Sequence, residues 1–328
     1  MKTSKAPFAR FILRLTIIGG VLGFLPLVQN PAWAQKAANA KAGGRDELIT
    51  AKDGWQLHCT WFPSSSGAES PVVIMLPAAE GHDAKSARTR KIWEKSALNL
   101  QSNGYAVMTV DLRKHGDSVP AAASSGTGKA AAVKLGPNDY TLMAAADLES
   151  VKEFLLAEHE KKQLNIGRLG ILSAGSSSAV SMAFAAADWS KPPYQDAPAP
   201  GPGEEDRRTQ RGRDVRALMM LTPKHTVKGL NTIAALRVLN ANPVAFHVIV
   251  SAEDSDGVKE SERIFKAVKL KGDEYKEVRL MTSAPVKAVS EGFLEGKEAD
   301  GTNKLMLSFL NRNLKEIQVP WKTRKSRL

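Results

Sequence analysis

Serines gather at one place in the chain where a hydroxyl could act as a nucleophile. Residues 169–180 read LGILSAGSSSAV, so that an apolar strand runs into small residues and an alanine-rich helix follows. A sharp strand-to-helix turn of this kind can present a serine Oγ for acyl transfer. The spelling G-x-S-x-G, which usually marks such a turn, is absent. The stretch therefore predicts the frame of a catalytic turn and leaves open which of its residues, if any, reacts.

The elements that would hold this turn alternate along the chain. Strands at 47–52 and 55–62 flank Asp53-Gly54, a strong hairpin signal. Strands are also predicted at 72–76, 105–110, 168–173, 216–222, 246–251 and 276–282. Apolar residues at helical spacing lie between several of them, while 119–138 and 191–213 are predicted to be mobile loops. This order predicts an α/β fold: a doubly wound, mostly parallel eight-stranded sheet with an N-terminal antiparallel hairpin.

Four blocks of sequence carry a family resemblance by their order and spacing. They are PVVIMLPAAEGHD (71–83), GYAVMTVDLRKHGDS (104–118), RLGILSAGSSSA (168–179) and VIVSAEDSD (248–256). Together they resemble the α/β-hydrolase superfamily, near its dienelactone-hydrolase and serine-aminopeptidase-like branches. The resemblance implies an oxyanion loop at Ala78 and Ala79, a structural turn in the second block, a nucleophile elbow in the third and an acid in the fourth.

The resemblance breaks down at the nucleophile. In the family the nucleophile lies five residues after the glycine that is Gly170 here, so the count falls on Gly175. Ser173 and Ser177 stand in place of the flanking glycines. A side chain at the elbow is strained by about 1–3 kcal/mol, and glycine avoids that strain. Gly175 therefore predicts a turn that is kept although its nucleophile is lost. A two-residue slip, with Ser177 as nucleophile, is the alternative.

The acid is retained, whereas the histidine is not. Asp254 and Asp256 follow a strand end and either matches the family acid, although both could instead cap the next helix. In this fold the histidine follows the acid in the chain. No histidine follows His247, and the loop where it belongs reads SAPVKAVS at 283–290. A serine without a base to take its proton is a poor nucleophile.

Two functions fit these observations. The first is a pseudo-hydrolase, a non-catalytic binding or structural protein for which a small acyl-type ligand is conceivable. The second is an active serine ester or amide hydrolase that uses Ser177 or Ser176 with a relocated base such as His225. His225 follows a strand whose carboxyl end should meet the same sheet edge as the elbow.

A metal or cofactor is not predicted. His82, Asp83, His115 and Asp117 follow successive strands, but they lack the tight spacing of a ligand set. Cys59 is the only cysteine, so an internal disulfide is impossible, and we expect a buried core residue there.

The N-terminus has the pattern of an export signal. Four basic residues precede an apolar run at 15–28, and Ala32-Trp33-Ala34 is a small-x-small cleavage site. We therefore expect a signal peptide at 1–34 cleaved after Ala34, a disordered leader at 35–45, the hydrolase-like domain at 46–318 and a basic tail at 319–328. The mature protein should be periplasmic or extracellular, without a transmembrane segment.

The formal charge of +12 is concentrated at the two ends of the chain. The expected signal peptide carries four of these charges, and four more lie at Lys322, Arg324, Lys325 and Arg327. The tail could touch anionic surfaces, although a solvated, frayed terminus is the interpretation that the sequence favours. Nothing else in the sequence indicates nucleic-acid binding.

Overall fold

The computed structural model describes residues 43–79, 89–119, 135–269 and 278–328. The expected signal peptide and most of the expected leader lie outside these residues. So do His82, Asp83 and most of the loop expected at 119–138.

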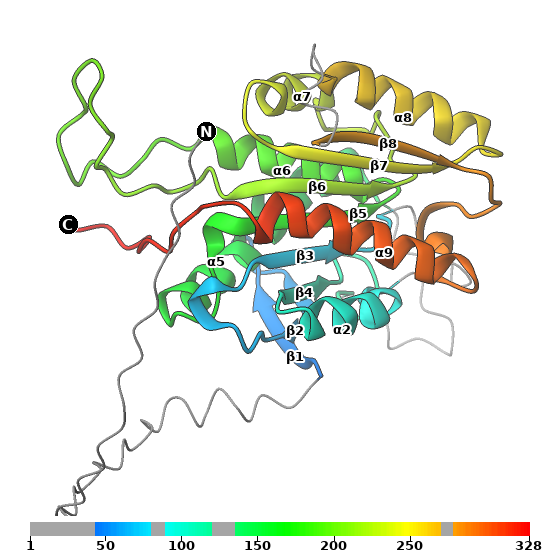
Figure 1. Ribbon diagram of the computed structural model, residues 1–328, viewed down its shortest axis with the longest axis horizontal. Coiled ribbons are helices and arrows are strands. Elements are labelled where there is room, and N and C mark those ends of the chain that lie inside the picture. Colours follow the sequence, from blue (N-terminus) through cyan, green and yellow to red (C-terminus); the bar gives the residue numbers. More distant parts are fainter. Residues whose placement is uncertain (1–42, 80–88, 120–134, 270–277) are drawn as a thin grey trace, which may run out of the picture.

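An eight-stranded sheet runs through the molecule in the order β1-β2-β4-β3-β5-β6-β7-β8 (Figure 1). β1 with β2, and β2 with β4, pair antiparallel, and the other neighbours pair parallel. This confirms the predicted fold class. The strands are β1 (Arg45–Thr50), β2 (Gln56–Phe62), β3 (Val72–Leu76), β4 (Ala106–Val110), β5 (Leu169–Ala174), β6 (Val215–Leu221), β7 (Ala245–Ser251) and β8 (Arg279–Ala284).

The burial of each strand explains its sequence pattern. β3 lies between β4 and β5 and is buried at every residue, so it reads as a continuous apolar run. β1 lies at the sheet edge, and Ile49 is its one buried residue. Gly54 takes φ +88° in the turn between β1 and β2, a conformation that glycine adopts without strain.

Helices cover both faces of the sheet. α5, α6, α7 and α8 supply apolar side chains such as Leu155 and Leu236 to the core on one face. α2 and α9 supply Leu100 and Leu310 to the core on the other face. The helices are α2 (Glu94–Ser102), α4 (Pro137–Leu142), α5 (Leu148–Glu160), α6 (Ser177–Ser190), α7 (Thr232–Asn240), α8 (Ser255–Val268) and α9 (Glu298–Leu310), with shorter turns at η1 (Gly67–Glu69), η2 (Arg90–Trp93), η3 (Met143–Asp147), η4 (Ile166–Arg168), η5 (Ser290–Leu294) and η6 (Asn311–Lys315).

The C-terminal tail is docked, which corrects the expectation of a frayed terminus. The Trp321 indole donates to the His159 carbonyl at the end of α5 (3.1 Å), and the two rings lie 4.8 Å apart. Arg324 forms an ion pair with the buried carboxylate of Asp214. The sequence misled because a basic run after the last helix looks solvated, whereas its partners lie more than a hundred residues earlier in the chain.

The insertion at 191–213 contains no helix or strand, as expected, and it extends away from the body of the molecule as a long loop (Figure 1). Its base is tied together where Thr209 bonds to Tyr194 and Asp196. Cys59 is buried in the core, which confirms that prediction. Within the described residues, no helix combines the length and the apolar character needed to cross a membrane.

Candidate active site

The turn between β5 and α6 lies at the carboxyl edge of the parallel strands, where ligands gather in sheets of this kind. Gly175 forms this turn with φ +51°. Its N–H donates to the Leu221 carbonyl at the end of β6 (3.0 Å), and its carbonyl accepts from Lys224 (3.2 Å). The turn is therefore left-handed and is held by the neighbouring strand. Gly175 as the site of a lost nucleophile is still an interpretation.

The serines around the turn are buried, and the bonds of their hydroxyls run inward. Ser177 is the first residue of α6, and its hydroxyl donates to the Pro77 carbonyl beyond the end of β3. Ser173 on β5 bonds to Ser181 (3.0 Å) and Ser178 (3.4 Å) on α6. These hydroxyls join the helix to the sheet. Ser176, at 7% exposed, lies at the start of the helix.

The loop after β3 is bonded to an acid that the sequence analysis missed, Glu291 in η5. The Ala78 N–H, at the expected oxyanion position, donates to Oε1 of Glu291, which is fully buried. Oε2 of the same carboxyl accepts from the Ser290 hydroxyl (2.7 Å). The Ala79 carbonyl accepts from the Tyr140 hydroxyl (2.8 Å). A carboxyl oxygen thus sits at the amide that the family resemblance assigns to an oxyanion.

Glu291 lies one residue beyond the segment 283–290, in which the resemblance places a histidine. An acid directly after a histidine-free loop was the one signal that could have drawn attention to it. Its contact with Ala78 spans 213 residues of sequence, and no local pattern predicts a pairing at that range.

Two strained residues support this carboxyl group. Ser290 has φ +54° and Thr222 has φ +44°, values that side-chain-bearing residues rarely adopt. The two meet where the Ser290 N–H donates to Thr222 Oγ1 (3.0 Å). Strain of this kind costs about 1–3 kcal/mol at each residue and clusters at functional sites. The backbone at Ser290 and Thr222 is thus held in one strained conformation.

Other predicted site residues form bonds with partners other than this carboxyl group. The His225 N–H donates to Glu260 (2.8 Å), and its ring Nδ1 contacts Thr226 (3.2 Å). No hydrogen bond joins its ring to Ser177 within the described residues, where the Ser177 hydroxyl is bonded to Pro77.

The two candidate acids differ in their surroundings. Asp254 caps α8 through a bond from the Gly257 N–H to Oδ1 (2.9 Å). Asp256 is exposed and pairs with Lys259 (3.1 Å). Asp254 therefore has the capping role that the sequence analysis weighed as the alternative to catalysis, whereas Asp256 lies in the first turn of the helix and makes an exposed ion pair.

The second sequence block forms a structural turn, as the resemblance implies. Arg90 binds the buried carboxylate of Asp111 (2.6 Å) and that of Asp117 (2.7 Å). The His115 Nδ1 contacts the Arg113 carbonyl (2.9 Å). Within the described residues there is no cluster of three or more possible metal ligands, and His82 and Asp83 lie outside them.

Comparison with known proteins gives relatives in structure. No protein-family model matches the sequence, and neither does any curated protein. The dienelactone hydrolase of Anabaena variabilis ATCC 29413 is 13% identical with a TM-score of 0.52, over 83% of this chain and 99% of that one. Esterase 2 of Thermogutta terrifontis, phosphoramylated by tabun, is 12% identical with a TM-score of 0.54, over 82% and 94%.

A third similar structure is the acylaminoacyl peptidase of Pyrococcus horikoshii. It is 15% identical with a TM-score of 0.53, over 85% of this chain and 43% of that one. At these identities the similarity shows a shared fold, and the catalytic groups must be judged from the residues that this chain carries.

Proposed function

We propose that this chain, which has the α/β-hydrolase fold, is an exported pseudo-hydrolase that no longer catalyses acyl transfer. The observation that carries the proposal is the bond between the Ala78 N–H and the buried carboxyl group of Glu291. In an acyl-transfer enzyme, a donor at this position must face the negative charge that develops on the substrate oxygen. Here an acceptor already occupies that donor.

The nucleophile position supports the same proposal. Gly175 offers no hydroxyl, and the neighbouring Ser177 directs its hydroxyl to the Pro77 carbonyl. No histidine follows His247 in the chain. A serine that replaced Gly175 would therefore still lack a base and a free oxyanion donor.

Fluorophosphonate labelling tests the absence of catalysis. We expect the purified protein to form no covalent adduct at Ser176 or Ser177, because no histidine follows the acid in the chain to take a serine proton. The measurement is intact-protein and peptide mass spectrometry, with a serine esterase labelled in the same mixture as a positive control. An adduct that disappears in Ser176→Ala or Ser177→Ala would overturn the proposal in favour of an active hydrolase.

The variant Gly175→Ser separates two reasons for inactivity. We expect this variant also to remain unlabelled, because Glu291 still holds the Ala78 amide. Gly175→Ala is the matched control for the strain that any side chain would add at φ +51°. Labelling of Gly175→Ser would mean that the loss of the hydroxyl alone silences the site, and it would remove the role given to Glu291.

The export part of the proposal rests on the sequence pattern of residues 1–34. Expression of the full chain in a bacterium with a secretory pathway should yield a mature protein that begins at Gln35. N-terminal mass spectrometry of the cell envelope and medium fractions measures this directly. A chain that keeps Met1 and stays in the cytoplasm would contradict it.

A further inference from the structure

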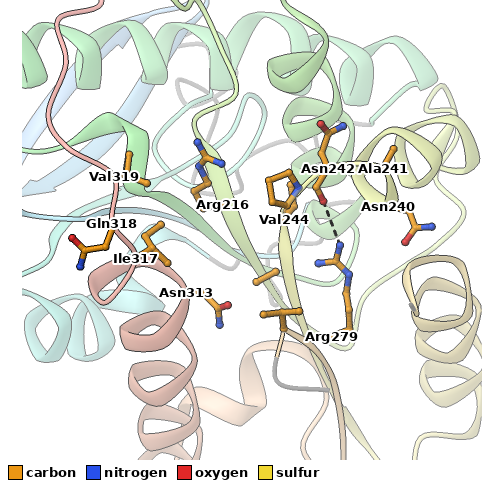
Figure 2. A pocket seen from close by; sticks show the side chains of 13 residues that line it. Arg216, Asn240, Ala241, Asn242, Val244, Arg279, Asn313, Ile317, Gln318 and Val319 are labelled. Atoms are coloured by element: carbon orange, nitrogen blue, oxygen red, sulfur yellow. Dashed lines mark hydrogen bonds between the residues drawn. The ribbon is translucent and has the colours of Figure 1, made fainter. Parts of the chain in front are cut away.

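A cavity lies at the amino ends of the parallel strands, opposite the strand ends that carry the Gly175 turn. It has a volume of about 620 Å³ and is lined by the amino ends of β6, β7 and β8, the turn between α7 and β7, and the chain that follows α9 (Figure 2). The usual ligand edge of this fold is the carboxyl edge. Nothing in the proposed function uses this cavity.

Arg279 places a buried cation in the cavity wall. It is 6% exposed, and its guanidinium donates from Nε to the Val268 carbonyl (3.1 Å) and from Nη2 to the Asn242 carbonyl (3.5 Å; dashed in Figure 2). The group lies over the Phe246 ring at 4.8 Å. Burial lowers the pKa of Arg279 to about 10, so the side chain is still charged at neutral pH. No carboxylate pairs with it within the described residues.

Arg216 places a second cation in the same wall. Leu169 pairs with Val215 and Gly170 pairs with Ala217, so Arg216 is an extra residue in β6 without a partner on β5. Such bulges re-aim a side chain. Its guanidinium lies over the Trp189 ring (5.0 Å) and makes a single long bond to the Gly167 carbonyl (3.4 Å).

No acid neutralises Arg216 by direct contact in the part of the chain that the structure describes. Asp214 and Asp188 favour its charged form from a distance, but burial outweighs them and lowers the pKa of Arg216. Asp214 is itself bound to Lys152 and Arg324. Arg216 is half-buried, and a partly desolvated cation that only a carbonyl and a ring contact is poorly compensated, so an anion would relieve that cost.

The rest of the wall shows what kind of anion fits. Val244, Val278, Ile317 and Val319 supply aliphatic surface, while side-chain amides come from Asn240, Asn242, Asn313 and Gln318. The volume is in the range of small-molecule sites, in which apolar walls and a few polar groups fix one ligand. An arginine guanidinium can bind a carboxylate through two parallel hydrogen bonds from its N–H groups.

We propose that this cavity binds a small organic carboxylate, with its anionic head at Arg216 and Arg279 and its apolar body against Val244, Ile317 and Val319. The site is independent of the proposed loss of catalysis, because it lies at the other edge of the sheet and shares no residue with the Gly175 turn. Either conclusion can therefore fail without the other.

Calorimetric titration with octanoate tests the site. We expect saturable binding at one site, weakened about tenfold or more in Arg279→Gln and in Arg216→Gln, because each loses a charge-assisted bond. Octanamide, which has the same chain without the charge, should not bind. Arg263→Gln is the matched control, because it removes one exposed arginine from α8 that pairs with Glu260 outside the cavity.

A variant at an exposed position tests the site without disturbing the buried part of the cavity wall. Gln318 is exposed and lines the cavity, so Gln318→Glu keeps the shape and adds a negative charge beside the ligand. We expect it to weaken octanoate binding with unchanged thermal unfolding. No saturable binding of octanoate, or binding that both arginine substitutions leave unchanged, would overturn the proposal. Inorganic phosphate bound as tightly as octanoate would overturn the assignment to an organic carboxylate.

Discussion

Replacement of Lys152 by methionine is expected to lower the free energy of unfolding by about 3–5 kcal/mol. Lys152 on α5 is fully buried, and its ammonium contacts the buried carboxylates of Asp188 and Asp214. Methionine fills a similar volume, so the loss comes from the charge. Two carboxylates would then share one remaining cation, Arg324 of the C-terminal tail. Urea unfolding at neutral pH measures the change.

The bonds around this cluster explain why the expected effect is large. Asp188, near the end of α6, accepts at Oδ2 from the backbone N–H groups of Asp214 (2.7 Å) and Val215 (3.3 Å). Burial alone would lower the pKa of Lys152, but Asp214 and Asp188 raise it above its usual value. The cation is thus fixed in its charged form, and it joins α5, α6, the start of β6 and the tail.

Two controls separate charge from packing. Lys161→Met removes an exposed lysine just after α5, whose ion pair with Glu158 should contribute less than about 1 kcal/mol. The double variant Lys152→Met/Asp188→Asn removes one carboxylate together with the cation, so it should recover part of the loss. If Lys152→Met unfolds within about 1 kcal/mol of the unaltered protein, the buried charges do not hold these elements together.

The sheet could be predicted from sequence because burial leaves a local signal. The predicted strand at 72–76 matches β3 residue for residue, since a strand covered on both faces is continuously apolar. β8 was predicted at 276–282 and is found at Arg279–Ala284, because its residues are mostly half-buried and mixed in character. α4 was missed because its single turn and a half starts inside a stretch rich in loop-forming residues.

The candidate site was less predictable because its contacts are not local. Gly175 could be singled out by counting along the elbow, and its positive φ is the kind of backbone that favours glycine. Glu291 could not be paired with Ala78, because an acid in a loop does not reveal a partner 213 residues earlier in the chain. Arg216 and Arg279 likewise appear in sequence only as basic residues near the starts of two predicted strands, and the fold brings them to one cavity.

A pH-dependent loss of stability should come from His247. This residue lies on β7, 3% exposed, with Nε2 bonded to Thr282 (2.9 Å) and its ring edge-on to Phe309. Burial lowers the pKa of His247 to about 4 in the folded protein, while in the unfolded chain it should be near 6.5. The buried imidazole is therefore neutral at pH values where the free side chain binds a proton.

The sign of the effect follows from which state binds the proton. Above about pH 6.5 His247 is neutral in both the folded and the unfolded state, so it does not reduce the free energy of unfolding of the protein. As the pH falls toward 4, the unfolded state gains the proton first, so stability falls by about 3 kcal/mol, of which about 2 kcal/mol is lost between pH 7 and pH 5. Urea unfolding at pH 7, 6 and 5 measures this slope.

The variant His247→Gln should flatten this slope, because glutamine does not titrate and can still reach Thr282 with a polar atom. His58→Gln on β2 is the matched control, since it removes a half-buried histidine and leaves His247 in place. Equal slopes for the unaltered protein and His247→Gln would place the acid sensitivity elsewhere.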